Sequence, residues 1–159
     1  MPRDPHIVVL GIGNTLLADE GIGVQAVAHL RREPAPRGLR LVDGGTLGLA
    51  LLEFVESADG LIVVDAARLG LVPGSVRRYD DAAIDSLLRG GIRTVHELGL
   101  KELFDMARLN GTLPARRALI AVEPACVDWS TALSPEVAAS LPAISELVLD
   151  TARAWREAP

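Results

Sequence analysis

The sequence predicts an α/β fold, in which a single three-layer domain has a twisted, mainly parallel sheet of about five strands with helices on both faces. Short, β-branched apolar runs alternate with segments of helical spacing along the whole chain. No linker, repeat or low-complexity segment interrupts the 159 residues, so residues 1–159 are predicted to form one domain. Hydrophobic residues make up 49% of the chain and aromatic residues only 3%, which favours an aliphatic core between sheet and helices.

The first half of the chain predicts two strands, each followed by a helix. Residues 7–11 form an apolar run that stops at a glycine, as a buried parallel strand does. After a glycine-containing turn, residues 22–30 place their apolar side chains on one face of a helix, which two prolines end. Residues 39–42 form the next strand, closed by Asp-Gly-Gly, and residues 47–55 again have helical spacing.

The middle of the chain holds the clearest strand, residues 61–64, which ends at Asp65. A Pro-Gly turn signal follows it. Residues 75–79 then predict a short strand that pairs across this turn.

The last third predicts one more helix and strand before a helical C-terminus. Residues 100–107 have the spacing of an amphipathic helix, and residues 118–122 form an apolar strand. Ser134 is a good N-cap, because proline and an acidic residue follow it in the first turn. Pro142 predicts a division into a short helix and a longer one that ends near Trp155.

Charge and cysteine content argue against several classes of protein. The formal net charge is −5, and the arginine pairs at 31–32, 77–78 and 116–117 are separate, so we interpret each as a solvated edge rather than a nucleic-acid surface. The single cysteine, Cys126, excludes an internal disulfide and a multi-cysteine metal cluster. No apolar run reaches the about 18 residues that cross a bilayer, and residues 1–6 lack the apolar part of a signal peptide. We expect a cytoplasmic protein that binds neither nucleic acid nor membranes.

Carboxylates follow three of the predicted strands. In parallel sheets, ligands bind beyond the carboxyl ends of the strands. This rule selects the loop after Gly11, together with Asp43 and Asp65. A turn-forming role is an equally good interpretation of Asp43 and Asp65, because aspartate is common in turns.

The loop after the first strand carries the acidic pair Asp19 and Glu20. A dinucleotide-binding domain, with Asp43 on the ribose, would need a glycine where Leu16 stands, and the acidic pair would repel a pyrophosphate. We interpret Asp19 as the N-cap of the first helix. Glu20 is flanked by helix-weakening glycines at 21 and 23, which indicate a backbone held close to another group.

The remaining candidates for chemistry are one histidine and one thiol. A lone histidine such as His96 is usually a capping or surface residue, and Leu100 stands where a zinc protease would need its second histidine. Together, Glu20, Asp65 and His96 would supply two carboxylates and an imidazole, a set that suits zinc, copper or nickel. The spacing alone does not show that the three converge. No Gly-x-Ser-x-Gly segment is present, and Cys126 has no neighbouring histidine to activate it.

Taken together, the motifs resemble those of the hydrogenase maturation endopeptidases, which process the large subunit of nickel–iron hydrogenases. The matching segments are GIGN at 11–14, DEGIG at 19–23, DGGTLG at 43–48, VVDA at 63–66, VHELGL at 95–100 and LSPE at 133–136. The ordered set covers nearly the whole chain, which makes it far more specific than any single motif. The segment VEP at 122–124, followed by Trp129, also resembles the C-terminal region of the family. Glu123 departs from the pattern, because family members often have glutamine before the proline that stands here at 124.

The resemblance implies that the metal-contacting residues of the family correspond to Glu20, Asp65 and His96, with Asp43 as a further candidate for hydrolysis. It also implies an endopeptidase that recognises nickel already held by the hydrogenase large-subunit precursor and then releases a short C-terminal extension. In crystals, we expect that a surrogate ion such as cadmium or zinc could take the place of nickel. Either the metal activates the scissile carbonyl or a water, or a carboxylate acts as general base. The alternative is a metal-gated escort module that binds the subunit without cutting it.

Overall fold

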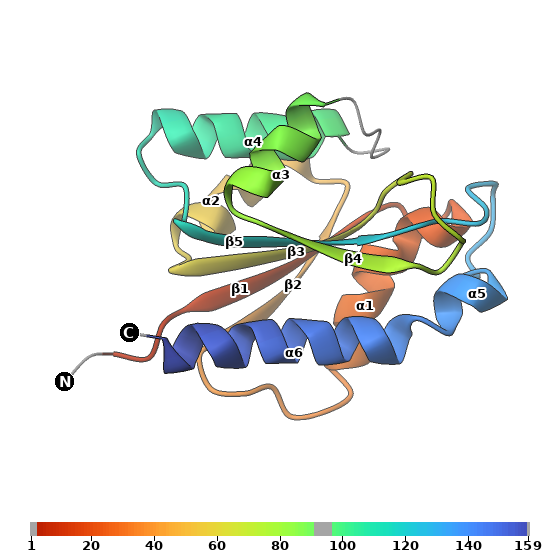
Figure 1. Ribbon diagram of the computed structural model, residues 1–159, viewed down its shortest axis with the longest axis horizontal. Helices are drawn as coiled ribbons and strands as arrows, with labels where there is room; N and C mark the ends of the chain where they lie inside the picture. The colour runs from red at the N-terminus through yellow and green to blue at the C-terminus, as the bar shows by residue number, and fades with distance from the viewer. Residues whose placement is uncertain (1–2, 91–96, 159) are drawn as a thin grey trace.

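The fold is built on a five-stranded sheet, as the sequence predicts (Figure 1). The computed structural model describes residues 3–90 and 97–158. The strands in this part of the chain are β1 (Ile7–Ile12), β2 (Leu39–Gly45), β3 (Gly60–Ala66), β4 (Val76–Asp80) and β5 (Arg116–Val122). Their spatial order is β2-β1-β3-β5-β4, and every neighbouring pair is parallel except β4 with β5.

Helices cover both faces of the sheet, which confirms the predicted three layers (Figure 1). One face carries α1 (Ile22–Leu30), α5 (Pro135–Ala138) and α6 (Leu141–Glu157), and the other carries α2 (Leu52–Glu56), α3 (Ala82–Arg89) and α4 (Glu97–Leu109). Two 3-10 turns, η1 (Ala18–Gly21) and η2 (Gly48–Leu51), precede α1 and α2. Helix α5 begins where predicted, since the side chain of Ser134 accepts a hydrogen bond from the Val137 N–H.

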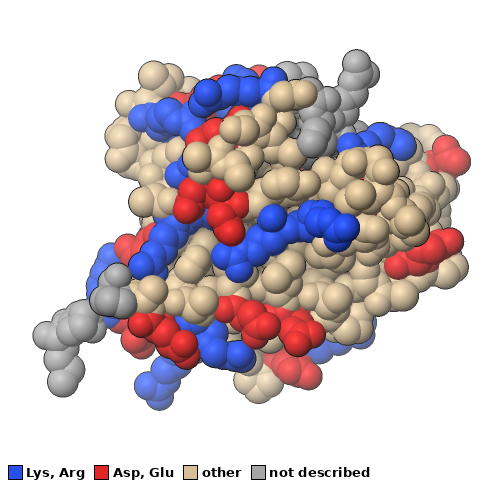
Figure 2. All heavy atoms as spheres, in the orientation of Figure 1, with Lys and Arg blue, Asp and Glu red and all other residues tan. Residues whose placement is uncertain are grey.

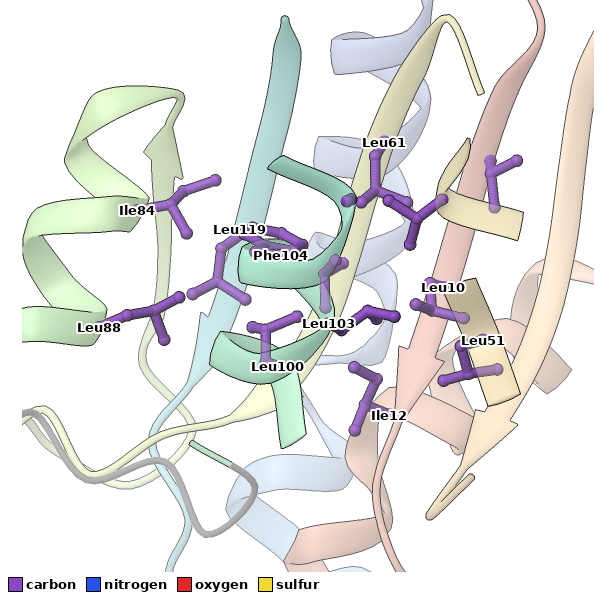
Figure 3. Close-up of a cluster of buried hydrophobic side chains, with 14 of the residues drawn as sticks. Leu10, Ile12, Leu51, Leu61, Ile84, Leu88, Leu100, Leu103, Phe104 and Leu119 are labelled. Carbon is purple, nitrogen blue, oxygen red and sulfur yellow. The ribbon is translucent and has the colours of Figure 1, made fainter. Parts of the chain in front are cut away.

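Two apolar cores hold the three layers together. Side chains alternate along each strand, so Leu10 of β1 faces α2, α3 and α4, whereas Val9 faces α1 and α6. Figure 3 shows the first core, in which Leu100, Leu103 and Phe104 of α4 pack on the sheet. Every side chain of β1 and β3 is buried, which is why both read as nearly continuous apolar runs.

The pairing of β4 corrects one prediction. The sequence predicts a strand at 75–79 that pairs across the Pro-Gly turn with the strand before it. Instead, β4 pairs antiparallel with β5, with Val76 opposite Val122 and Asp80 opposite Ala118. The reason lies in the strand order: β3 has β1 on one side and β5 on the other, so neither of its edges can accept β4.

The region after β4 brings two more corrections. Helix α3 has no counterpart among the predicted elements, although it buries Ile84, Leu87 and Leu88. Arg117, predicted to be solvated, is only 9% exposed and forms an ion pair with Asp85 at 3.2 Å. The basic side chains along β4, by contrast, lie at the surface, as Figure 2 shows.

Among the described residues, no helix is both long enough and apolar enough to cross a membrane.

Candidate active site

The carboxyl ends of β1, β2, β3 and β5 meet at one edge of the sheet, which we call the carboxyl edge (Figure 1). Glu20 lies there in η1 and is only 2% exposed, and Asp65 lies near the end of β3 and is 0% exposed. Because η1 contacts β3, the structure brings together the two elements that carry these predicted residues. Burying two carboxylates on adjoining elements is energetically unfavourable, so the pair is more readily explained by function than by stability.

Asp65 is part of the sheet and not of a turn. It lies within β3 opposite Ala121 of β5, and its Oδ1 accepts the Ala66 N–H at 2.8 Å. Ala121 belongs to the core that α4 covers, so the strand alternation turns Asp65 toward that same face. The turn-forming interpretation of Asp65 is therefore wrong.

Glycines allow η1 and α1 to approach the strands closely enough to bury Glu20. A Cβ at Gly23 would lie 2.2 Å from the Val64 carbonyl oxygen, and a Cβ at Gly11 would lie 2.2 Å from the Gly23 carbonyl oxygen. Gly13 has φ +149, and a Cβ there would lie 1.9 Å from the carbonyl oxygen of Glu20. No side chain fits at such distances. The close backbone approach inferred from the glycines around Glu20 is confirmed.

Asp19, the neighbour of Glu20, holds the loop after β5 in place. It is fully buried, and its Oδ2 accepts hydrogen bonds from the Ala125 N–H at 2.8 Å, the Cys126 N–H at 2.9 Å and the Ser134 hydroxyl at 2.8 Å. Its Oδ1 accepts the Ser134 N–H at 2.8 Å. Burial acts to raise the pKa of Asp19, but the hydrogen bonds from Ser134, Cys126 and Ala125 outweigh burial and lower that pKa below its ordinary value.

The predicted N-cap role of Asp19 is therefore wrong. Gly21 occupies the N-cap position of α1, with no side-chain hydrogen bond to the helix. The residue before Asp19 is held in an unusual conformation: Ala18 has φ 50, and its N–H donates to the Ser130 carbonyl at 2.8 Å. A non-glycine residue in this region stores backbone strain, which is common beside functional sites. Asp19 and Ala18 together tie the turn that carries Glu20 to the loop after β5.

We expect Asp19→Ala to lower the free energy of unfolding by about 3 kcal/mol, because the buried donors of the loop lose their shared acceptor. Ser134→Ala is the comparison, since it removes one of the four donors to Asp19 together with the N-cap acceptor of the Val137 N–H, and we expect it to cost about 1 to 2 kcal/mol. Urea denaturation measures both values. Amide hydrogen exchange at Cys126 should also accelerate in Asp19→Ala. A loss for Asp19→Ala no larger than that for Ser134→Ala would contradict the role of Asp19 in holding this loop.

The other two predicted site residues are His96 and Asp43. His96 lies outside the described residues. Asp43 lies within β2 opposite Gly11, and its side chain is exposed. Leu41 of the same strand packs on the core beside α1, so alternation places Asp43 on that side of the sheet and Asp65 on the other. A part for Asp43 in hydrolysis stays a prediction.

Glu123 also lies at the carboxyl edge, and the sequence prediction assigned no role to it. It is 7% exposed, and its carboxylate accepts the Leu69 N–H at 2.5 Å. Its backbone is paired with Gly74 and Ser75 at 2.9 Å. Glu123 therefore joins the loop after β3 to the loop after β5. The signal that could have revealed it is a carboxylate placed directly after the apolar run of β5.

The donor groups of the described site are carboxylates. Within residues 3–90 and 97–158, no group of three His, Cys, Asp or Glu side chains is arranged to hold a metal ion. Cys126 is half-buried, with its Sγ 3.8 Å from a carboxylate oxygen of Asp128. The described arrangement can therefore donate oxygen ligands to a cation, or accept a proton from water, through Glu20 and Asp65.

Comparison with known proteins decides the family. Residues 24–151 match the sequence profile of the hydrogenase maturation proteases, which is most of the chain. This chain belongs to the hydrogenase maturation protease family. The hydrogenase expression/formation protein HupD of Rhodobacter capsulatus is 40% identical over 156 residues, which cover 96% of this chain and 74% of HupD. The hydrogenase 2 maturation protease of Escherichia coli K12 is 35% identical over 150 residues, which cover 93% and 91% of the two chains.

Solved structures agree with this assignment. The hydrogenase maturating endopeptidase HybD from Escherichia coli superposes with a TM-score of 0.86 at 33% identity, covering 93% of this chain and 92% of HybD. The [NiFe] hydrogenase maturation protease HybD from Thermococcus kodakarensis gives a TM-score of 0.81 at 25% identity, with 92% and 99% covered. This member of the hydrogenase maturation protease family is therefore a peptide-bond hydrolase, which argues against the escort and dinucleotide-binding alternatives.

Proposed function

We propose that this hydrogenase maturation protease removes the C-terminal extension of a nickel–iron hydrogenase large-subunit precursor after nickel insertion. Nickel held in the precursor is the recognition element. The observation that carries the proposal is the pair of buried carboxylates, Glu20 and Asp65, on adjoining elements at the carboxyl edge of a family member. Such a pair suits a cation that arrives with the substrate.

The chemistry of the donor set supports nickel as part of the substrate. Glu20, Asp65 and His96 offer two oxygens and one nitrogen, which leaves a coordination sphere incomplete. An incomplete set binds free nickel weakly but can complete the coordination of nickel that substrate thiolates already hold. Cleavage then requires both the ligands of this protein and the nickel held by the precursor, so it follows metal insertion.

Hydrolysis can use the same residues. A bound metal would supply a Lewis acid at the scissile carbonyl or lower the pKa of a water. Glu20 and Asp65 are positioned at the carboxyl edge to orient that group, and a carboxylate that does not contact the metal can take the proton from the attacking water. Asp43, exposed at the end of β2, is the further candidate for this base.

Intact mass of the cognate precursor tests the proposal. We expect loss of one discrete C-terminal mass after incubation with this protein when the precursor has been loaded with nickel, and no loss when it is nickel-free. Each sample is also run without the protein, as a control for self-cleavage. An unchanged mass in the nickel-loaded sample would contradict the proposed activity, and equal cleavage in both samples would contradict nickel recognition.

A further inference from the structure

Large apolar side chains are exposed around the carboxyl edge. Of the seven that stand out among the described residues, two lie on α4, namely Met106 and Leu109. The other five lie in the segments that follow four different strands, and we call them the apolar rim. The apolar rim consists of Leu16 after β1, Leu47 and Leu49 after β2, Val72 after β3 and Trp129 after β5, with exposures of 53%, 60%, 47%, 77% and 80%.

The loops of the apolar rim are fixed to one another by backbone hydrogen bonds. The Ser130 N–H donates to the Leu16 carbonyl at 3.0 Å, which joins the loop after β5 to the loop after β1. The Gly13 N–H donates to the Gly45 carbonyl at 2.9 Å, which joins the loop after β1 to the end of β2. The Gly74 N–H donates to the Glu123 carbonyl at 2.9 Å, which joins the loops after β3 and β5. A surface held in this way loses little conformational freedom when a partner binds.

Asp19 also helps to fix the apolar rim. Its carboxylate holds Cys126 and Ser134 on the two sides of Trp129, so the segment that displays this tryptophan is anchored at both ends. Tryptophan is one of the residues enriched at the energetic centre of protein interfaces. An anchored loop that leaves it 80% exposed indicates a contact surface rather than a loosely packed end.

We propose that the apolar rim is the docking surface for the folded body of the hydrogenase precursor. The identity of this partner rests on the proposed function. A protein whose peptide bond reaches Glu20 and Asp65 must lie on the loops around them. The rim follows four neighbouring strands, which are about 4.8 Å apart, so it spans roughly 14 Å across the sheet. One extended tail has the width of a single strand, whereas a folded surface can cover the whole rim.

A second copy of this chain is the less suitable occupant. Two copies joined through the apolar rim would cover Glu20 and Asp65 and close the site to a protein substrate. The folded precursor covers Glu20 and Asp65 only until its scissile peptide bond is cleaved. The rim therefore serves to bind the precursor and leaves the free protein open.

Binding and cleavage by three variants test the docking surface. Trp129→Ser and Leu47→Ser change the apolar rim, and Leu109→Ser is the matched control, because Leu109 is 82% exposed but lies on α4. Binding is measured with the nickel-free precursor, which lacks the nickel contact and which we expect not to be cut, so that docking on the rim is observed separately from nickel recognition and from cleavage. Steady-state cleavage of the nickel-loaded precursor then gives kcat and KM, and urea midpoints confirm that each variant is folded.

We expect Trp129→Ser to raise both the Kd and the KM at least tenfold with kcat within about twofold, which is the size of effect that central interface residues produce. Leu47→Ser should raise both about threefold, and Leu109→Ser should leave both unchanged. A synthetic peptide spanning the cleavage site should bind at least a hundredfold more weakly than the precursor.

Four outcomes would overturn the docking proposal. Wild-type cleavage with unaltered Kd and KM in both rim variants would reject it and leave the proposed function intact. Tight binding of the peptide would assign the rim to the tail instead of the folded body. Sedimentation of the free protein as a dimer that Trp129→Ser separates would assign the rim to a second copy. Wild-type protein that neither binds nor cleaves the precursor would reject the partner together with the proposed function.

Discussion

Glu20→Gln and Asp65→Asn are each expected to lower kcat/KM for the nickel-loaded precursor at least a hundredfold, which corresponds to about 2.7 kcal/mol of transition-state stabilisation. Each change keeps the size of the side chain and removes its charge. The amide is a weaker ligand for a cation and cannot accept a proton as a carboxylate does. His96→Ala is expected to have an effect of the same order if the histidine completes the set. Steady-state cleavage followed by intact mass measures all three.

Matched controls separate this effect from a general loss of charge. Glu56→Gln and Asp59→Asn make the same chemical changes away from the carboxyl edge, at the end of α2 and just before β3. We expect both controls to keep kcat/KM within about threefold of the wild type. Urea denaturation should give Glu20→Gln and Asp65→Asn free energies of unfolding at or above that of the wild type, because each change removes a buried charge. Full processing by either of these two variants would reject the assignment of that carboxylate.

Much of the fold could be predicted because the information lies close together in the sequence. The buried strands β1, β3 and β5 read as short apolar runs, since helices cover both of their faces and no polar alternation is needed. The pairing of β4 could not be predicted in the same way. Whether a strand joins its neighbour in sequence or a later one depends on which sheet edge remains open, and here β5, formed 36 residues after β4, supplies that edge.

The candidate site could likewise be predicted only in part. The positions of Glu20 and Asp65 at one edge follow from where their strands end, so a rule about parallel sheets could select them. The role of Asp19 could not be found, because its partners Ala125, Cys126 and Ser134 lie 106 to 115 residues away. Local sequence offered only the N-cap interpretation, since a helix follows directly. Long-range hydrogen bonds of this kind leave no periodic signal.

Gly23→Ala is expected to lower the free energy of unfolding by about 4 kcal/mol or more, in the range where a single change can unfold a small domain. The added Cβ would meet the Val64 carbonyl oxygen at 2.2 Å and the Ile12 carbonyl oxygen at 2.3 Å. Both are backbone atoms of buried strands, so neither can move aside as the end of a flexible side chain could. Helix α1 would have to move away from the sheet, and Glu20 would move with it. Urea denaturation, or the soluble yield where the variant is too unstable, measures the effect.

Gly99→Ala is the control for this prediction. Gly99 lies in α4, and a Cβ added there meets nothing within 4 Å. Alanine in a helix is favoured over glycine by up to about 1 kcal/mol, so we expect Gly99→Ala to leave the free energy of unfolding unchanged or to raise it by up to that amount. The same substitution should therefore lower the free energy of unfolding at Gly23 but not at Gly99. If Gly23→Ala costs less than about 1 kcal/mol, α1 does not lie against β1 and β3 as closely as described, and the burial of Glu20 loses its physical basis.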